Sequence, residues 1–396
     1  MSESGSPAAI IVGGAVNAVS IARSLAPDGV EVIALGTGGV DPVRRSRHCQ
    51  RYVRIRSPAG GLQAAWLEWL THNAQALGGA VVLPAEDEAL ELIARHRAQL
   101  VELGYHPFEA DDNALLAMLD KGQTAKIARK AGIPQPQTIV IRDDESLARA
   151  VTELGFPFAL KPLHSHVLAR LSGWGKLEVV SDAQRLEELM SQLREHGVEV
   201  LAAELIPGGD DQLVSYYSYI DEQGEPLLHF CKQQIRAHPP LYGLSTYHRS
   251  FWDPEVADAG LRFFAAAGVR GLVNVQFKRD ARDGRLMLIE CNHRFTAANE
   301  LVRLSGINLA RVTYDRALGR PTPPVGSARN DTRLWDPVQD TRALLKLRAS
   351  EEITVMRWVS SLLHRQHMPL LSANDPGPAS VYFSSAMRLL RSRLPG

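Results

Sequence analysis

The chain lacks most of the features that would place it in a specialised class of proteins. Its 396 residues include three cysteines, which are too few and too scattered for a disulfide framework or a zinc site. Lysine plus arginine and aspartate plus glutamate number 44 each, so no overall charge favours nucleic acid or an anionic membrane as a partner. No apolar run approaches the length that a bilayer requires, and the opening MSESGSPAAI has no signal-peptide pattern. We therefore expect a cytoplasmic protein that does not bind nucleic acid.

The composition that is present is typical of a globular protein with more than one domain. Hydrophobic residues make up 45% and charged residues 22% of a chain that is longer than one core usually organises. In the first hundred residues, short β-branched runs such as AIIVGG and VEVIALG alternate with helical patterns. This alternation predicts parallel βαβ units, and we place an N-terminal parallel α/β domain over residues 1–111.

A second unit begins near residue 112 with the stretch DKGQTAKIARKAGIP. Asp120 and Gln123 have the spacing of a helix N-cap with its capping-box partner, and Gly132 with Pro134 ends the helix. Lys121 then lies at the positive end of the helix dipole, where an anion is favoured and a cation is not. Either a ligand phosphate neutralises Lys121, or it is a solvated lysine at a small cost.

Two strands flank a glycine-bearing loop in the stretch GFPFALKPLHSHVLARLSGWGKLEVV. FPFAL is an apolar strand that ends at Lys161, and LEVV is a second strand. The loop SGWGK between them could fold over phosphates through its backbone N–H groups, although turns between strands commonly contain glycine. The following run VEVLAAELIPGGDDQLVSYYSYIDEQGEPLLHF predicts an antiparallel meander.

The stretch GLVNVQFKRDARDGRLMLIECNHR holds polar residues on two strands that are otherwise apolar. Period-two alternation places Gln276 on the face opposite to Val275 and Phe277 on the first strand, and it places Glu290 and Asn292 together on one face of the second strand. If the two strands pair, the three side chains form an oxygen cluster that suits Mg²⁺. The alternative is the solvent-exposed polar face of an edge hairpin.

The motifs DK, FPFALKP, ELIPGGDD, NVQF and LIECNHR, in this order, resemble the ATP-grasp superfamily. NVQF with LIECN resembles the large subunit of carbamoyl phosphate synthetase, whereas RAHPPLYGLSTYHRS and GINLARVTYDRALGR are similar to carboxylate-amine ligases of the D-aspartate ligase type. The resemblance implies an ATP-grasp fold of mixed α/β and α+β class, in which two α+β subdomains that sandwich ATP follow the N-terminal domain. We place the ATP-grasp domain over residues 112–325 with its lid at about 134–203, and a mainly helical extension over residues 326–396.

The same resemblance implies roles for individual residues, which we state here as expectations. Phosphate binding is expected from two lysines together with a third in the lid, adenine binding from a linker segment, and ribose binding from one of two adjacent acids. Gln276, Glu290 and Asn292 match metal ligands, and Arg294 matches the arginine that steadies the transition state. The nucleotide-binding set is Lys121, Lys161, Lys176, Glu204, Leu205, Ile206, Asp210 and Asp211.

The implied reaction is ATP-dependent amide or peptide bond formation through an acyl phosphate, with release of ADP and phosphate. It requires Mg²⁺, with Mn²⁺ as a substitute, and a small carboxylate and an amine as substrates. Two alternatives remain open: a bicarbonate-using carboxylase or carbamoylating enzyme, and a nucleotide-binding module without catalysis. Gln276 stands where many members have an acid, which removes one negative charge from the metal site. SGWG is also poorer in glycine than the lid of biotin carboxylase.

Two further expectations concern residues outside these motifs. Arg236 has the forked guanidinium that suits a carboxylate or phosphate, so we expect a substrate or phosphate anchor, with a surface salt bridge as the alternative; Lys232 is a second candidate for the same role. The basic, amphipathic end SSAMRLLRSRLPG reads as a docking helix, and we do not expect it to touch a membrane. The oligomeric state, monomer or homodimer, is left open.

Overall fold

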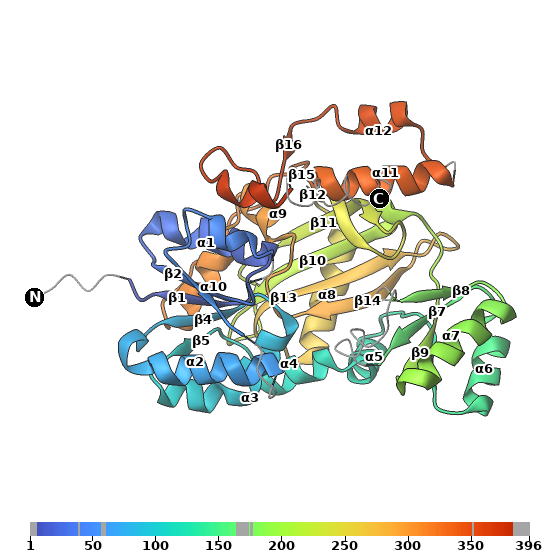
Figure 1. Ribbon diagram of the computed structural model, residues 1–396, viewed down its shortest axis with the longest axis horizontal. Coiled ribbons are helices and arrows are strands. Elements are labelled where there is room, and N and C mark those ends of the chain that lie inside the picture. Colours follow the sequence, from blue (N-terminus) through green and yellow to red (C-terminus); the bar gives the residue numbers. More distant parts are fainter. Residues whose placement is uncertain are drawn as a thin grey trace, which may run out of the picture.

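Three β-sheets organise the protein (Figure 1). The computed structural model describes residues 6–38, 40–56, 61–163, 174, 177–350 and 352–382. Along the chain, a five-stranded sheet comes first, a four-stranded sheet second and a seven-stranded sheet third. We call the seven-stranded sheet the central sheet. The architecture confirms the expected mixture of α/β and α+β structure.

The first sheet is parallel throughout, with strand order β3-β2-β1-β4-β5, as the alternating pattern predicts. At the end of β1, Gly13 has φ +111°, and a side chain there would collide with Glu86, so glycine is required for this turn. The Gly14 N–H donates to Glu86 Oε1 at 3.3 Å, which links the turn to the end of β4. The elements are β1 (Ala9–Val12), α1 (Val16–Leu25), β2 (Val32–Gly36), β3 (Arg51–Arg54), α2 (Gly61–Leu77), β4 (Val81–Pro84), α3 (Asp87–Glu102) and β5 (His106–Pro107).

The central sheet has the order β14-β13-β10-β11-β12-β15-β16 and has two different faces. One face packs its apolar residues, including Val273, Val275 and Phe277, into one core with the helix α8, as the period-two pattern predicts. The opposite face carries the polar residues of the same strands, and toward one end its apolar residues Tyr217, Tyr219 and Leu272 join the core of the N-terminal domain. The elements are β10 (Leu213–Ile220), β11 (Phe230–His238), β12 (Leu244–Phe251), α8 (Pro254–Ala267), β13 (Gly271–Arg279), β14 (Leu286–Asn292), β15 (Arg333–Trp335) and β16 (Gln366–His367).

The four-stranded sheet is antiparallel, with the order β6-β9-β7-β8, and forms a separate small unit with two helices, drawn in green in Figure 1. The predicted meander is wrong at its first strand: β9 pairs with β6 and β7 of this sheet, and only β10 and β11 form the expected hairpin. The elements of this part of the chain are α4 (Asp112–Leu119), α5 (Lys121–Lys130), β6 (Thr138–Ile141), α6 (Asp144–Leu154), β7 (Phe158–Pro162), β8 (Glu178–Val180), α7 (Ala183–His196) and β9 (Val200–Glu204).

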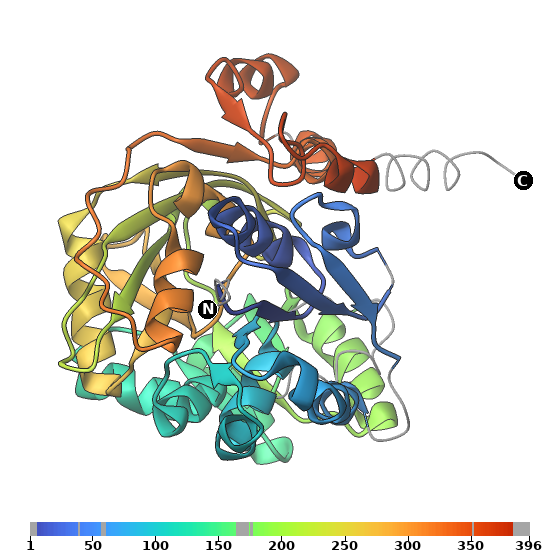
Figure 2. The same ribbon diagram turned by 90° about the vertical axis from the view of Figure 1, so that its left-hand side faces the viewer.

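The C-terminal extension lies along the central sheet and the N-terminal domain, in red in Figure 2. It was expected to be mainly helical, but it also contributes β15 and β16 to the central sheet. The short strands have little apolar periodicity of their own, so their pairing depends on the edge that β12 presents. The helices of the extension are α11 (Pro337–Ala349) and α12 (Val355–Ser361), and α9 (Asn299–Leu304) and α10 (Leu309–Ala317) precede it. The basic segment 384–396 lies outside the described residues.

Two buried ion pairs attach this extension to the rest of the protein. Arg236 of β11 and Asp340 of α11 form a bidentate pair with both distances at 2.8 Å. Arg23 of α1 contacts Asp375 at 2.9 Å and Glu300 at 3.1 Å, with all three side chains almost fully buried. The carboxylate of Asp340 also accepts hydrogen bonds from Thr246, Trp335 and Trp358. Full hydrogen bonding of this kind is what allows a charge to be buried.

Within the described part of the chain, no helix combines the length and the apolar character needed to cross a bilayer.

Candidate active site

A continuous row of polar residues crosses the polar face of the central sheet. The register pairs Lys232 with Ser215, Ser215 with Gln276, and Gln276 with Glu290 across four adjacent strands. Directly paired residues on neighbouring strands project to the same side of a sheet, so these four side chains share one face. The strand pairing on which the predicted metal site depended is therefore present.

The oxygen cluster is built from Gln276, Glu290 and Asn292. Gln276 lies directly opposite Glu290, and Asn292 follows on the same face and donates from Nδ2 to Glu290 Oε1 at 3.2 Å. The second carboxylate oxygen of Glu290 and the Gln276 side chain make no hydrogen bond to the described residues. One carboxylate and two amides are hard oxygen ligands with little total charge, which fits Mg²⁺ that keeps waters and substrate phosphates as its other ligands. These residues fit such an ion.

Lys161 lies close to this cluster, and a second lysine, Lys121, lies beside the end of the same strand. Lys161 lies on β7, and burial lowers the pKa of its ammonium group while the nearby Glu290 carboxylate raises it. Lys121 is the first residue of α5, and its Nζ donates to the carbonyl oxygen of Pro162 at 2.8 Å. Asp120 caps this helix by accepting from the Gln123 N–H, as predicted, but among the described residues the Gln123 side chain does not complete the predicted capping box. The fold therefore brings both sequence-predicted lysines to the end of β7.

Arg294 lies just beyond β14 and connects the cluster to the N-terminal domain. Its guanidinium forms an ion pair with Asp87 at the start of α3, and it is close enough to Glu290 for the two charges to interact. Asp87 is three residues past the end of the buried strand β4, so the carboxyl edge of the parallel sheet borders the site. Ligands in parallel α/β sheets bind at this edge, which agrees with the placement of Arg294.

The predicted nucleoside-binding residues lie where the small sheet joins the central sheet. Glu204 ends β9, and its carboxylate pairs with Arg282 at 2.6 Å; Leu205 and the buried Ile206 follow. Asp210 accepts from the backbone N–H groups of Ala237 and Leu241, both at 2.8 Å, so its two oxygens already stabilise the β11–β12 connection. Asp211 is exposed and is the freer of the two predicted ribose acids.

The remaining two predicted site residues are Lys176 and Arg236. Lys176 lies outside the described residues. Arg236 is on the central sheet, but its guanidinium is fully engaged with Asp340, Ser361 and the ring of Tyr247. The prediction that Arg236 anchors a substrate or phosphate is therefore wrong, and so is the alternative of a surface salt bridge. The two side chains of the ion pair are 6% and 0% exposed, and the pair attaches the C-terminal extension to the central sheet.

The polar face of the central sheet contains two residues that the motif comparison did not assign. Lys232 is 3% exposed, and burial lowers the pKa of its ammonium group to about 8 while Glu290 raises it. His248 on β12 lies opposite Gln234, and burial together with the Lys232 charge holds its pKa well below the usual value. The sequence signal for Lys232 was a lysine inside the strand FCKQQIR; for His248 it was a histidine at an alternate position of STYHRS.

Comparisons with known proteins find relatives of this chain among ligases and synthases. A family model described as "ATP-grasp in the biosynthetic pathway with Ter operon" matches residues 248–336. D-aspartate ligase from Enterococcus faecium is 25% identical over 64% of this chain and 63% of its own length. The C-terminal section of the carbamoyl phosphate synthase large chain from Methanopyrus kandleri is 25% identical over 57% of this chain and 42% of its own. The chain thus spans less than two thirds of either relative.

Solved structures with the same fold include two nucleotide complexes. The N5-carboxyaminoimidazole synthetase from Staphylococcus aureus, complexed with ADP, gives a TM-score of 0.62 at 15% identity over 83% of this chain and 80% of its own. The biotin carboxylase–β,γ-ATP complex from Campylobacter jejuni gives a TM-score of 0.63 at 15% identity, over 82% of this chain and 74% of its own. The protein has the ATP-grasp fold, and the resemblance drawn from its motifs is confirmed. Among ATP-grasp proteins it is similar to D-aspartate ligase and to carbamoyl phosphate synthase.

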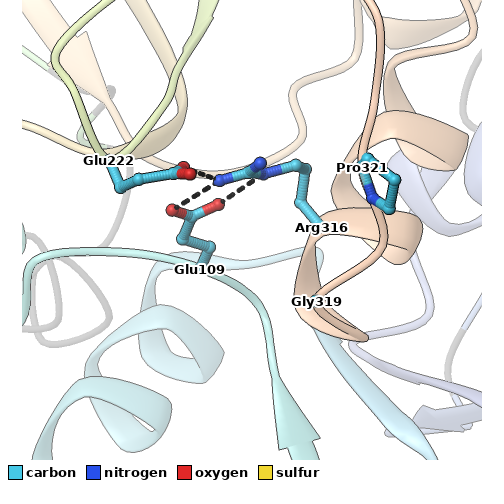
Figure 3. Close-up of a pocket in the computed structure, with 5 residues that line it drawn as sticks. All are labelled: Glu109, Glu222, Arg316, Gly319 and Pro321. Carbon is cyan, nitrogen blue, oxygen red and sulfur yellow. Dashed lines mark hydrogen bonds and ion pairs between the residues drawn. The ribbon is translucent and has the colours of Figure 1, made fainter.

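A surface cavity of about 340 Å³ lies apart from these residues and is lined by Glu109, Glu222, Arg316, Gly319 and Pro321 (Figure 3). Arg316 pairs with both glutamates there. The guanidinium is therefore already paired with two carboxylates, and the charged residues of the lining sum to a formal charge of −1.

Proposed function

We propose that the protein is an ATP-dependent, ADP-forming carboxylate-amine ligase acting on an amino acid or small peptide. Its substrates would be a small carboxylate, an amine and ATP, with Mg²⁺ as the metal. The proposal rests above all on the cluster of Gln276, Glu290 and Asn292 on one face of the central sheet. Lys161 and Arg294 come from outside that sheet, and both lie close enough to Glu290 for their charges to interact with it. The similarity to D-aspartate ligase favours amide formation over the other reactions of proteins with this fold.

The chemistry in this proposal is phosphoryl transfer followed by acyl transfer. An oxygen of the substrate carboxylate attacks the γ-phosphorus of ATP, the bond to the β–γ bridging oxygen breaks, and ADP leaves. The amine then attacks the acyl carbon, phosphate leaves with the bonding electrons, and the ammonium formed loses a proton. Lys121, Lys161 and Arg294 neutralise negative charge during the first step, which is the main contribution that a protein makes to phosphoryl transfer. Bound Mg²⁺ would add a further electrophile.

The test is a screen of ADP release over amino acids, dipeptides and amines, with and without bicarbonate. We expect release that requires an acid and an amine together and that bicarbonate does not replace. Release that requires bicarbonate would instead support a carboxylase or carbamoylating enzyme, a second candidate that the fold shared with biotin carboxylase favours. Binding of ATP without release under any condition would identify a non-catalytic nucleotide-binding module.

Lys161→Met is expected to weaken ATP binding by about 10–100-fold, because a charge-assisted hydrogen bond to phosphate contributes about 1.5–3 kcal/mol. Isothermal titration calorimetry with Mg²⁺ and a non-hydrolysable ATP analogue measures this directly. Lys130→Met, which removes an exposed lysine at the end of α5, is the matched control and should leave binding unchanged. Equal affinity in the two variants would remove Lys161 from the phosphate site.

A further inference from the structure

The far end of the polar row holds a buried cation without a buried counter-charge. Lys232 is 3% exposed and makes no hydrogen bond or ion pair with any residue that the structure describes. The carboxylate that raises its pKa against the effect of burial is that of Glu290. Glu290 is three strands away, which at the usual strand spacing is about 14 Å between Cα atoms. A buried ammonium group in this situation is costly unless a ligand compensates it.

The neighbours of Lys232 have unused hydrogen-bonding capacity as well. Ser215, paired with Lys232 across the sheet, is fully buried, and its Oγ has no partner among the described residues. His248 on the next strand is 5% exposed, and neither ring nitrogen has a partner in the same part of the structure. Its opposite residue, Gln234, follows Lys232 on the same face. Three buried polar side chains from three adjacent strands therefore share one region of the sheet.

The chemistry of these three residues selects a particular ligand. An ammonium group offers only donors, and a hydroxyl and a neutral imidazole each offer one donor. A carboxylate is acceptor-only, carries the missing charge and has two oxygens with about four lone-pair sites, so it can satisfy several of these donors together. A neutral amide or sugar would leave the ammonium charge uncompensated.

We propose that Lys232, Ser215 and His248 form a subsite for a second carboxylate of the acid substrate, which makes that substrate a dicarboxylic acid. The inference rests on the proposed function for the location of the reacting carboxylate. That group must lie within about 3–3.5 Å of the γ-phosphorus. It is therefore held beside Glu290 and Asn292 on β14, and the second carboxylate reaches along the row toward β11. Arg236 on the same strand is already paired with Asp340. Lys232 is therefore the cationic side chain of β11 that remains for this role.

The binding test does not depend on turnover. The full chain with Mg²⁺ and a non-hydrolysable ATP analogue is titrated calorimetrically with D-aspartate, L-aspartate, D-glutamate and L-glutamate, and with the monocarboxylate 2-aminobutyrate. We expect at least one dicarboxylate to bind about 10-fold or more tightly than 2-aminobutyrate. Absence of any such preference in the wild-type protein overturns the subsite, whether or not its variants fold.

Variants then locate the preference. Lys232→Met and His248→Gln should each lose about 10-fold or more of the dicarboxylate affinity and keep the affinity for the ATP analogue. Arg249→Gln is the matched control, because Arg249 is adjacent to His248 but contacts Gln233 on the opposite face. If Lys232→Met weakens the ATP analogue instead, Lys232 is a phosphate ligand and the proposal fails. If no amide forms in the screen but the preference persists, the ligase proposal fails and the subsite stands.

Discussion

Glu290→Gln is expected to reduce Mg²⁺-dependent ADP release by about 10²–10³-fold, because it removes the one negative charge from the proposed oxygen cluster. The amide keeps the shape of the side chain, so the pairing of β13 with β14 should be retained. The change should also raise the Mg²⁺ concentration needed for half-maximal rate. A coupled assay of ADP release at several Mg²⁺ concentrations gives both quantities.

A neighbouring residue supplies the control for this experiment. Cys291→Ala alters the same strand on the opposite face, where Cys291 packs against the apolar core with α8. Its ADP release should match that of the parent protein at every Mg²⁺ concentration. Unchanged turnover in Glu290→Gln would remove the metal assignment, and equal losses in both variants would indicate a distorted strand.

Asp340→Ala is expected to lower the free energy of unfolding by about 3–5 kcal/mol, because it leaves Arg236 buried without its counter-charge. Asp340 is fully buried, and the change also removes the acceptor for Trp335 and Trp358. Urea unfolding followed by tryptophan fluorescence measures the loss near these rings.

Two comparisons separate this effect from ordinary mutational damage. Removal of an exposed pair, as in Arg194→Ala, should cost about 0–1 kcal/mol, since Arg194 and Asp144 are 66% and 92% exposed. The double change Arg236→Met with Asp340→Leu should recover most of the lost stability, because apolar replacements of a buried pair are often tolerated. A loss below about 1 kcal/mol in Asp340→Ala would show that Arg236 finds another partner.

Local patterns in the sequence were sufficient for those parts of the fold that depend on neighbouring residues. The alternation around Val275 and Gln276 correctly separated the two faces of β13, and Asp120 correctly marked the start of α5. The ATP-grasp fold followed from motifs at the ends of strands. These features depend on periodicity, capping and spacing, which are all visible along the chain.

Features that depend on distant residues were not predictable in this way. Which sheet β9 joins is decided by its edge partners β6 and β7, and the sequence places β9 next to β10. The state of Arg236 depends on Asp340, which is 104 residues away. Burial of Lys232 and His248 depends on the alignment of three strands, so their lack of partners becomes visible only in the folded protein.

The pairs Arg236–Asp340 and Arg23–Asp375 give the C-terminal extension the role of a brace between the central sheet and helix α1. Any swing of the N-terminal domain away from β14 would have to extract at least one buried ion pair, at a cost of several kcal/mol. The small sheet β6–β9 is tied to the remainder by half-exposed contacts such as Arg282 with Glu204. In the proposed ligase, a rotation of that small sheet relative to the central sheet would therefore be the least costly way to admit nucleotide and release product.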